Sequence, residues 1–259
     1  MDQESISSNL YLRCALPLAR VLREDFAGFY DKLHYGFNAV VQFRIAGIEE
    51  PATHLVFEDG KLSVAFGIHP KPTLTFEFPN RKALNGFFGG KMGLDYLPKI
   101  KPLWRLDVTL RVLPLLLQLK ILDPKNLPSN PKKQALKVKL AIYMITAALS
   151  QLNKSGDPEM ADWTKKQPDR IYQWSVKDGP AAYLRVRGGK TRSGRGFYER
   201  RRPFLHMSFA DIHGAFMVLT SQAPLVEAVE RGFLSTEGSP EYAKEVGAFM
   251  QKIELMLKA

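Results

Sequence analysis

The side chains that most often carry catalysis or metal binding are sparse in this sequence. The five histidines are His34, His54, His69, His206 and His213. They form no close metal-ligand spacing, and no grouping of Ser, His and Asp is recognisable. The single cysteine, Cys14, excludes an internal disulfide and any metal site built from cysteines. We therefore expect no catalytic residue, no metal and no cofactor.

One short motif suggests a phosphate-binding loop. Gly189-Lys190-Thr191 carries the end of that motif, but the motif also needs a glycine at the position of Leu184. The tripeptide moreover lies between two strand patterns, whereas a phosphate-binding loop precedes a helix. The segment is therefore better explained as a turn.

A basic segment from Arg185 to Arg202 concentrates the positive charge of the chain, whose formal net charge is +11. Its cations outnumber its one acid, Glu199, by seven, and they are Arg185, Arg187, Lys190, Arg192, Arg195, Arg200, Arg201 and Arg202. Such a field attracts anionic headgroups, nucleic acid and acidic proteins alike. Three interpretations stay open: a solvated hairpin, docking on an anionic membrane and, least favoured, single-stranded nucleic acid with help from Phe197 and Tyr198.

The most apolar stretch runs from Leu84 to Leu122, and its second half would form a helix that is apolar on more than one face. One helical stripe is Leu106, Leu110, Leu113 and Leu117. Much of the other side is Val108, Val112, Leu115 and Leu119. One face can pack on its own domain. The other requires a partner domain, a membrane or a lipid-like ligand.

The elements that would position these residues are a helix, several strands and a second helix. Apolar residues repeat at helical spacing from Leu18 to Leu33. Alternation then predicts strands at residues 41–45, 55–57, 62–66 and 74–78. Asp59-Gly60 predicts a tight hairpin, and Asn80 predicts the cap of a helix through Phe88.

The second half of the chain repeats this order after a proline-rich linker. Phe43 corresponds to Trp174 and Asn80 to Asp211, each 131 residues on. Both halves close with a helix, the second of which begins at Pro240 and is plainly amphipathic. The constant spacing predicts a tandem duplication and an internal pseudo-dimer, with the chain itself a monomer. The predicted boundaries are an N-terminal arm at 1–17, a first domain at 18–122, a linker at 123–133 and a divergent second domain at 134–259.

Each half resembles the sterol carrier protein type 2 domain family. The resemblance is clearest in Val56-Phe57-Glu58-Asp59-Gly60-Lys61-Leu62 and from Phe76 to Lys91, where Phe87-Phe88-Gly89-Gly90-Lys91-Met92 matches the family's Gly-Lys-Met turn. The second copy keeps Leu205 to Leu219 and Phe233 to Gly238 but has Thr220-Ser221-Gln222 in place of that turn. Counting both copies, the resemblance covers about nine tenths of the chain.

The resemblance implies an α/β fold of the α+β type: two tandem sterol-carrier-like domains, each a mostly antiparallel sheet covered by helices, with an apolar tunnel between them. It implies no catalytic residue. The residues expected to line the tunnels are Phe76, Phe87, Phe88, Met92, Leu97, Ile100, Trp104, Leu106, Leu110, Leu113, Leu117, Phe209, Phe216, Leu219, Phe233, Val246, Phe249, Met250 and Ile253. We expect the ligand to be a fatty acyl, sterol or isoprenoid lipid.

These observations predict a non-enzymatic protein that binds a hydrophobic ligand and transfers or presents it, with peripheral contact to anionic membrane. The alternative is an accessory or scaffold protein that presents a lipid intermediate to a partner enzyme. No export or organelle signal is visible, so the expected compartment is the cytoplasm. The longest apolar run, Leu140 to Leu149, is about half of the ~20 residues that a membrane-spanning helix needs.

Overall fold

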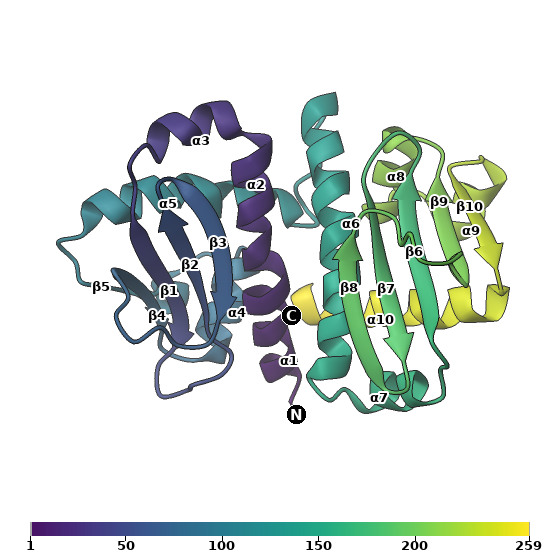
Figure 1. The fold of residues 1–259 in the computed structure, drawn as a ribbon, viewed down its shortest axis with the longest axis horizontal. Helices are drawn as coiled ribbons and strands as arrows, with labels where there is room; N and C mark the ends of the chain where they lie inside the picture. Colours follow the sequence, from purple (N-terminus) through teal and green to yellow (C-terminus); the bar gives the residue numbers. More distant parts are fainter. Residues whose placement is uncertain (1, 259) are drawn as a thin grey trace. The chain divides into compact units, whose positions relative to one another are not determined.

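The computed structural model describes residues 2–258 and divides the chain into two compact units (Figure 1). The N-terminal unit comprises Asp2–Asp123 together with the last residues from Met256 onward, and the C-terminal unit comprises Pro124–Leu255. The division falls at the start of the segment that the sequence predicts as a linker. Each unit holds one five-stranded sheet, so the fold is mixed α/β.

The N-terminal unit begins with a long helical run, and its sheet has the strand order β3-β2-β1-β4-β5. Its helical elements are α1 (Gln3–Leu10), η1 (Tyr11–Ala15), η2 (Leu16–Leu18), α2 (Ala19–Asp25), α3 (Ala27–Leu33), α4 (Arg81–Phe88), η3 (Leu94–Tyr96), α5 (Leu106–Leu119) and η4 (Lys120–Leu122). Its strands are β1 (Ala39–Ile45), β2 (Thr53–Glu58), β3 (Lys61–Phe66), β4 (Leu74–Phe78) and β5 (Lys99–Lys101).

The C-terminal unit repeats this architecture, with the strand order β10-β9-β6-β7-β8. Its helices are α6 (Pro131–Lys154), α7 (Pro158–Lys165), α8 (Ile212–Leu219), α9 (Leu225–Glu230) and α10 (Pro240–Lys258). Its strands are β6 (Arg170–Val176), β7 (Ala181–Arg187), β8 (Lys190–Arg195), β9 (Leu205–Phe209) and β10 (Leu234–Gly238).

The spacing of 131 residues also relates the central strand pairs of the two sheets. In the N-terminal sheet β1 and β4 are parallel, with Phe43 opposite Phe76. In the C-terminal sheet β6 and β9 are parallel, with Trp174 opposite Met207. The remaining pairings in both sheets are antiparallel. A parallel pair needs a long crossover connection, which the intervening hairpin and loop supply.

Local sequence signals account for several element boundaries. Asn80 accepts a hydrogen bond from the N–H of Ala83 at 2.8 Å and Asp211 one from Gly214 at 2.7 Å, which caps α4 and α8 as predicted. Asp59 and Gly60 both have positive φ, 47° and 74°, as a type I′ hairpin turn requires. Gly60 also has to be glycine because a Cβ there would lie 2.4 Å from the carbonyl oxygen of His34.

The N-terminal segment differs from the peripheral arm that the sequence suggested. Residues 3–25 form a continuous helical run through α1, η1, η2 and α2, and Leu10, Leu12 and Leu16 are fully buried. Pro17 lies in the first turn of η2, where its missing N–H costs nothing. The apolar spacing before Leu18 was too irregular to predict a helix because the run passes through π and 3-10 geometry.

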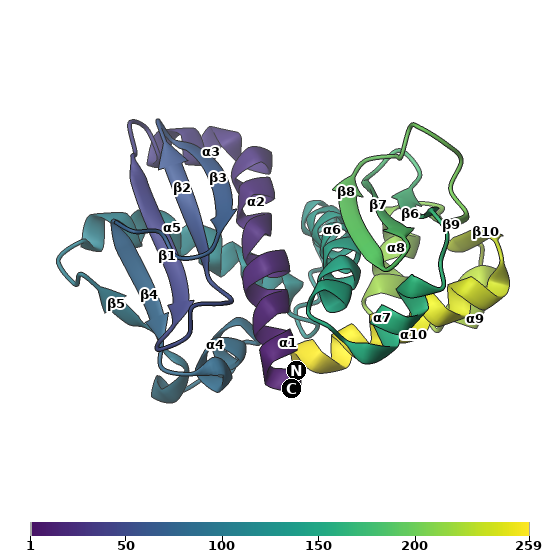
Figure 2. The same cartoon turned by 60° about the horizontal axis from the view of Figure 1, so that its bottom comes forward.

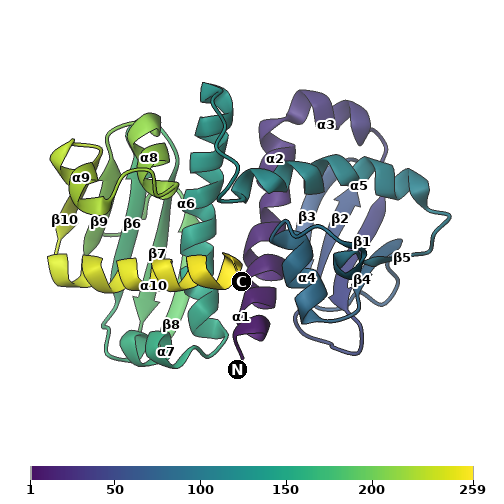
Figure 3. The ribbon, with the colours of Figure 1, turned by 180° about the vertical axis from the view of Figure 1, so that it is seen from behind.

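Helices cover one face of each sheet, and in the described part of the chain the other face carries none (Figures 1, 2 and 3). Alternation along the strands therefore gives each sheet an inner face toward the helices and an outer, helix-free face. By length and composition α6 could cross a membrane. Most of its apolar window is buried inside the fold, against β7, β8 and α8, as in a central core helix.

Candidate functional site

The two apolar stripes of α5 lie in opposite environments. Val108, Val112 and Leu115 are fully buried and Leu119 nearly so, on the side that packs against α2. The opposite stripe, offset by two residues and hence by about 200°, is exposed to solvent. It consists of Leu106, Leu110, Leu113 and Leu117, of which Leu110 is 65% exposed. Helix α5 crosses the helical layer of the N-terminal unit (Figure 3).

The exposed stripe continues into the residues just before the helix. Leu103 and Trp104 are exposed, Trp104 to 81%. We call Leu103, Trp104, Leu106, Leu110, Leu113 and Leu117 the outer apolar face. Nine of the nineteen large apolar side chains found exposed in the described residues fall between Met92 and Leu117. Single exposed apolar residues are ordinary in folded proteins, but such a concentration marks an interaction surface.

A second exposed group precedes β5, and α4 holds it in place. Met92, Leu94 and Leu97 flank the short η3, and Met92 is 90% exposed. The ring of Tyr96 lies so close to α4 that a Cβ on Gly86 would meet it at 2.2 Å. Glycine at position 86 therefore lets the η3 segment pack on the helix. Strand β5 then places Ile100 opposite Phe76 at the edge of the sheet.

Polar contacts fix α5 to the rest of the unit. The Nε2 of buried His34 donates to the carbonyl oxygen of Arg111 at 3.0 Å, and burial lowers the pKa of His34, which keeps the ring neutral. The guanidinium of Arg111 lies over the ring of Phe37, 5.0 Å from its centre. These contacts anchor the inner side of the helix and leave its leucine stripe outside.

The structure distributes the predicted tunnel residues over three environments. Those in the packed core are Phe76, Phe209, Phe216, Val246, Phe249 and Ile253. Those that are half-buried are Phe87, Phe88, Ile100, Leu219, Phe233 and Met250. Those on the surface are Met92, Leu97, Trp104, Leu106, Leu110, Leu113 and Leu117. The surface group thus lies outside the layer between helices and sheet where a tunnel was expected.

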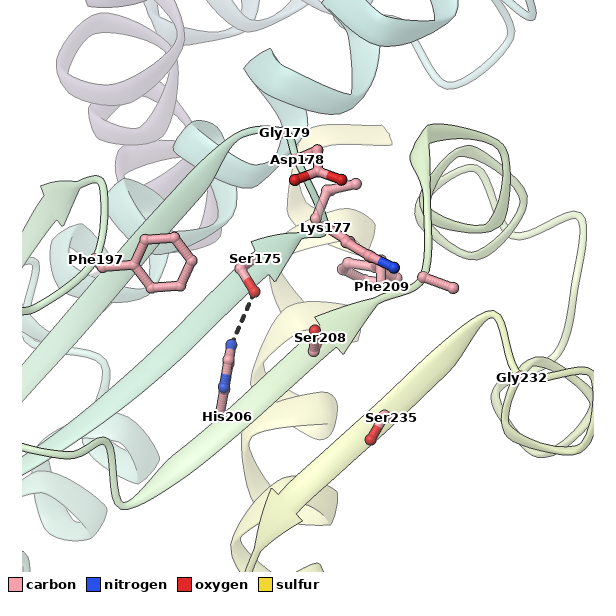
Figure 4. Close-up of a pocket in the computed structure, with 12 residues that line it drawn as sticks. Ser175, Lys177, Asp178, Gly179, Phe197, His206, Ser208, Phe209, Gly232 and Ser235 are labelled. Atoms are coloured by element: carbon pink, nitrogen blue, oxygen red, sulfur yellow. Dashed lines mark hydrogen bonds between the residues drawn. The ribbon is translucent and has the colours of Figure 1, made fainter.

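In the C-terminal unit, two of the predicted residues lie beside hollows. Phe249 borders one of about 540 Å³ between α7 and α10, next to Trp163, whose Nε1 donates to Glu245 at 2.6 Å. Phe209 borders a second hollow of about 550 Å³ on the outer face of the sheet (Figure 4). The second hollow is the more polar and brings together residues that the sequence analysis did not single out.

The second hollow contains a row of three serines across adjacent strands. Ser175 on β6 lies opposite Ser208 on β9, which lies opposite Ser235 on β10. The Ser175 hydroxyl is hydrogen-bonded to Nε2 of His206 at 2.8 Å, and Phe197 flanks the pair (Figure 4). In the N-terminal sheet the corresponding register positions carry larger charged side chains, which are Arg44, Glu77 and Lys99. The hollow therefore exists because serines replace them.

A serine bonded to a histidine raises the question of acyl transfer chemistry. Burial lowers the pKa of His206, so its ring is neutral near pH 7 and able to accept a proton. A nucleophilic serine also needs an orienting acid and oxyanion donors. Glu237, opposite His206 in the register, is paired with Arg202 at 3.4 Å. The N–H groups of Lys177 and Ala210 donate to strand carbonyls. This arrangement fits a polar binding hollow better than a catalytic site.

The predicted basic segment forms the β7–β8 hairpin and the following loop. Arg185 lies directly opposite Arg192, an unfavourable pair. Asp169 relieves it by binding Arg185 at 2.7 Å and Arg201 at 2.5 Å, and the two guanidinium groups lower the pKa of Asp169 to about 2. The guanidinium of Arg195 lies over the ring of Tyr143. Exposed cations remain at Arg187, Lys190, Arg192, Arg200 and Arg202.

The histidines do not assemble a metal site in the part of the chain that the structure describes, where no group of three possible His, Cys, Asp or Glu ligands occurs. His54 and His69 contact each other through their rings, and His213 packs on Phe233. The serine row and His206 were missed by sequence reasoning. The 131-residue spacing holds the signal, because it aligns Arg44 with Ser175 and Glu77 with Ser208.

Comparisons with known proteins do not assign a family. No family model and no curated protein matches the sequence. Two solved structures overlap with part of the chain: the stereoselective inverting sec-alkylsulfatase Pisa1 from Pseudomonas sp. (14% identity, TM-score 0.25) and a double mutant of it (13%, 0.28). They cover 55% and 56% of this chain, which spans about a quarter of their length, 28% and 27%. Similarity this weak carries no argument about function.

Proposed function

We propose that the protein binds a hydrophobic ligand, a fatty acyl, sterol or isoprenoid lipid, and transfers or presents it without catalysing a reaction. The two units are, in this proposal, tandem sterol-carrier-like domains, and the N-terminal one provides the main ligand contact. The observation that carries the proposal is the exposed leucine stripe of α5, directly opposite a stripe that is already buried.

Energetics favour a covered stripe. Burying an exposed leucine stabilises by roughly 1.5–3 kcal/mol, so four of them left in water represent a substantial free energy available to a ligand. A lipid with ~16 buried methylenes gains roughly 13 kcal/mol of gross transfer free energy at ~0.8 kcal/mol each. Association and ordering costs cancel much of this gain, so micromolar affinity is the expected range. No polar catalyst is needed for such binding.

A second candidate is an accessory protein that presents a lipid intermediate to an enzyme, and the same stripe favours it. Positions 106, 110, 113 and 117 have the i, i+4, i+7, i+11 spacing by which a helix packs against a partner helix. The two candidates differ in what accompanies the purified protein. A carrier retains a lipid, whereas an accessory protein retains a second polypeptide.

The direct test is organic extraction of purified protein followed by lipid mass spectrometry, together with titration of a fluorescent fatty acid in vesicle-free buffer. We expect a co-purified lipid and saturable binding. Leu110→Asp and Leu117→Asp should each abolish fatty acid binding. Val226→Asp is the matched control, because Val226 is an equally exposed apolar residue on α9 of the C-terminal unit. An empty wild-type protein that does not bind the probe would refute the proposal.

A further inference from the structure

The outer apolar face has a chemical composition that identifies its partner more closely. It combines aliphatic side chains with an exposed tryptophan, Trp104, at one end of the leucine stripe. Tryptophan concentrates at the headgroup level of membranes, where its ring is apolar and its N–H stays hydrated. Leucines on one side of a surface helix lie deeper, at the boundary with the acyl chains.

Charge around this face is positive. Between residues 99 and 120 the cations outnumber the single acid, Asp107, by four, and they are Lys99, Lys101, Arg105, Arg111 and Lys120. Asp107 is bound to Arg105 at 3.0 Å. Glu77 on the outer face of the sheet is bound to Lys101 at 2.5 Å, and it also accepts from Arg44, which offsets its charge. An apolar helix face with cations near it is complementary to an anionic bilayer surface.

We propose that the outer apolar face is the surface on which the N-terminal unit docks onto anionic membranes, with Trp104 at headgroup level and the leucine stripe of α5 inserted below it. This inference deepens the proposed function, on which it rests, by naming the partner from which the same face would take or to which it would give a lipid. It also assigns docking to α5, whereas the charge pattern of the sequence had pointed to the β7–β8 hairpin.

Two other occupants fit the observations less well. A second copy of the chain would bring two faces of like charge together, which costs free energy at each approach. The basic hairpin has the charge to attract a membrane but a weak anchor, since Phe197 is the exposed large apolar residue found in it. Three of its arginines are moreover bound to acids: Arg185 and Arg201 to Asp169, and Arg202 to Glu237.

Vesicle flotation of the full chain tests the assignment. Vesicles of phosphatidylcholine with about 30% phosphatidylglycerol should bind the protein, and pure phosphatidylcholine vesicles should bind it at least about ten-fold less, because roughly five-fold is expected per neutralised cation. Raising salt from about 0.1 to 0.5 M should weaken binding, since screening shortens the range of the field. A Leu106→Asp/Leu110→Asp variant should lose at least ten-fold.

Two matched variants serve as controls. Val226→Asp/Val229→Asp places the same change on two exposed residues of α9, and Arg187→Ser/Arg192→Ser removes exposed charge from the hairpin. Both should stay within about two-fold of wild type. The proposal is overturned if the Leu106→Asp/Leu110→Asp variant still floats like wild type, or if the hairpin variant loses binding. It is also overturned if sedimentation without vesicles shows a dimer that the leucine variant dissociates.

Trp104 provides an internal probe of insertion. The other tryptophans, Trp163 and Trp174, are 9% and 1% exposed, so a change in emission on adding vesicles reports on Trp104. We expect a blue shift on anionic vesicles and quenching by brominated lipid, both lost in Trp104→Phe. Flotation with unchanged emission would overturn docking through this face.

Failure of the docking surface and failure of the proposed function give different results. Lipid extraction and fatty acid titration use no added vesicles. A protein that is empty of lipid yet floats on anionic vesicles with shifted Trp104 emission supports the docking surface and removes the carrier function. A lipid-loaded protein that does not float supports the carrier function and removes the docking surface.

Discussion

The two units share a strand order but differ in both faces of their structure. On the outer face both hold a buried glutamine in the same role: Gln42 accepts from the N–H of His69 and Gln173 from that of Tyr198, which fastens the crossover loop to the sheet. Beside this shared glutamine, the N-terminal unit has an ion network at Glu77, and the C-terminal unit has the serine row.

The helical side differs in the opposite sense. In the C-terminal unit α10 buries Val246, Phe249 and Ile253 and turns mostly polar residues outward, so its apolar surface is satisfied within the fold. In the N-terminal unit α5 has a second stripe of leucines outside. A repeated topology thus constrains the sheet and the caps and leaves the exposed faces free to diverge. The N-terminal unit presents an apolar surface, and the C-terminal unit presents a polar hollow.

The largest expected effect separates the two sides of α5. Val112→Asp places a carboxylate where the side chain is fully buried, and we expect the N-terminal unit to lose about 4 kcal/mol or more, enough to unfold it. Leu110→Asp, two residues away on the exposed side, should change the free energy of unfolding by no more than about 0.5 kcal/mol. Hydrogen exchange mass spectrometry measures residues 2–123 and 124–255 separately.

The C-terminal unit is the internal control for this pair, since its exchange should be unaffected by either substitution. Strong protection of residues 2–123 in the Val112→Asp variant would show that α5 does not pack by its valine stripe. Loss of protection in Leu110→Asp would show that the leucine stripe is also part of the core, and the contrast between the stripes would vanish.

The next effect concerns the outer faces. Glu77 is nearly buried and bound to Arg44 and Lys101, both at 2.5 Å, and these contacts lower its pKa. The carboxylate therefore contributes stability above its ordinary pKa of 4.5, and this contribution is lost as pH falls through the lowered value in the folded state. We expect Glu77→Gln to cost about 1 to 2 kcal/mol at pH 7, a discounted figure because both cations are partly exposed.

Urea unfolding of wild type and Glu77→Gln between pH 3 and 7 measures this effect. The difference in free energy of unfolding should be largest at neutral pH and should shrink below about pH 4.5. Ser208→Ala is the matched change at the corresponding position of the C-terminal sheet and should show no such pH dependence. A difference that stays constant over the whole range would mean that the ion network does not stabilise the fold.

Local sequence signals predicted a large part of this fold. Asn80, Asp211 and Asp59-Gly60 act within a few residues of themselves, so their roles follow from chain geometry alone. The double-sided character of α5 was also visible in its spacing. The strand β5 was missed because its three residues carry no alternation and owe their conformation to pairing with β4. Which stripe of α5 faces outward likewise depends on tertiary packing.

The serine hollow shows the same limit for the site. Ser175, Ser208 and Ser235 are ordinary residues in sequence, and their alignment arises only from the register of three strands that are distant along the chain. The leucine stripe, in contrast, is local to one helix and was predicted from spacing, although as a tunnel lining rather than an exterior surface. Sites built on one element are predictable from sequence to the extent that sites built across elements are not.

The smallest expected effect tests how the repeat tolerates divergence after α4 and α8. Gly90 has a φ of 76°, and Ser221, 131 residues on, holds a φ of 57°. In both turns the next residue, Lys91 or Gln222, donates its N–H back to a helical carbonyl at 2.8 Å. Left-handed backbone costs a non-glycine residue roughly 1–2 kcal/mol, partly offset by the extra freedom of glycine in the unfolded chain. Ser221→Gly should therefore stabilise the C-terminal unit by about 0.5 kcal/mol.

The reverse substitution sharpens the same comparison. Gly90→Ser should destabilise the N-terminal unit by more than Ser221→Gly stabilises the other, because a Cβ at position 90 would also lie 3.1 Å from a carboxylate oxygen of Asp123. Urea midpoints with hydrogen exchange of each unit measure both changes. Equal and opposite effects would indicate that backbone conformation alone decides the two turns. A destabilising Ser221→Gly would instead mean that the serine makes a favourable contact that outweighs its backbone cost, and the two turns would then owe their shape to different causes.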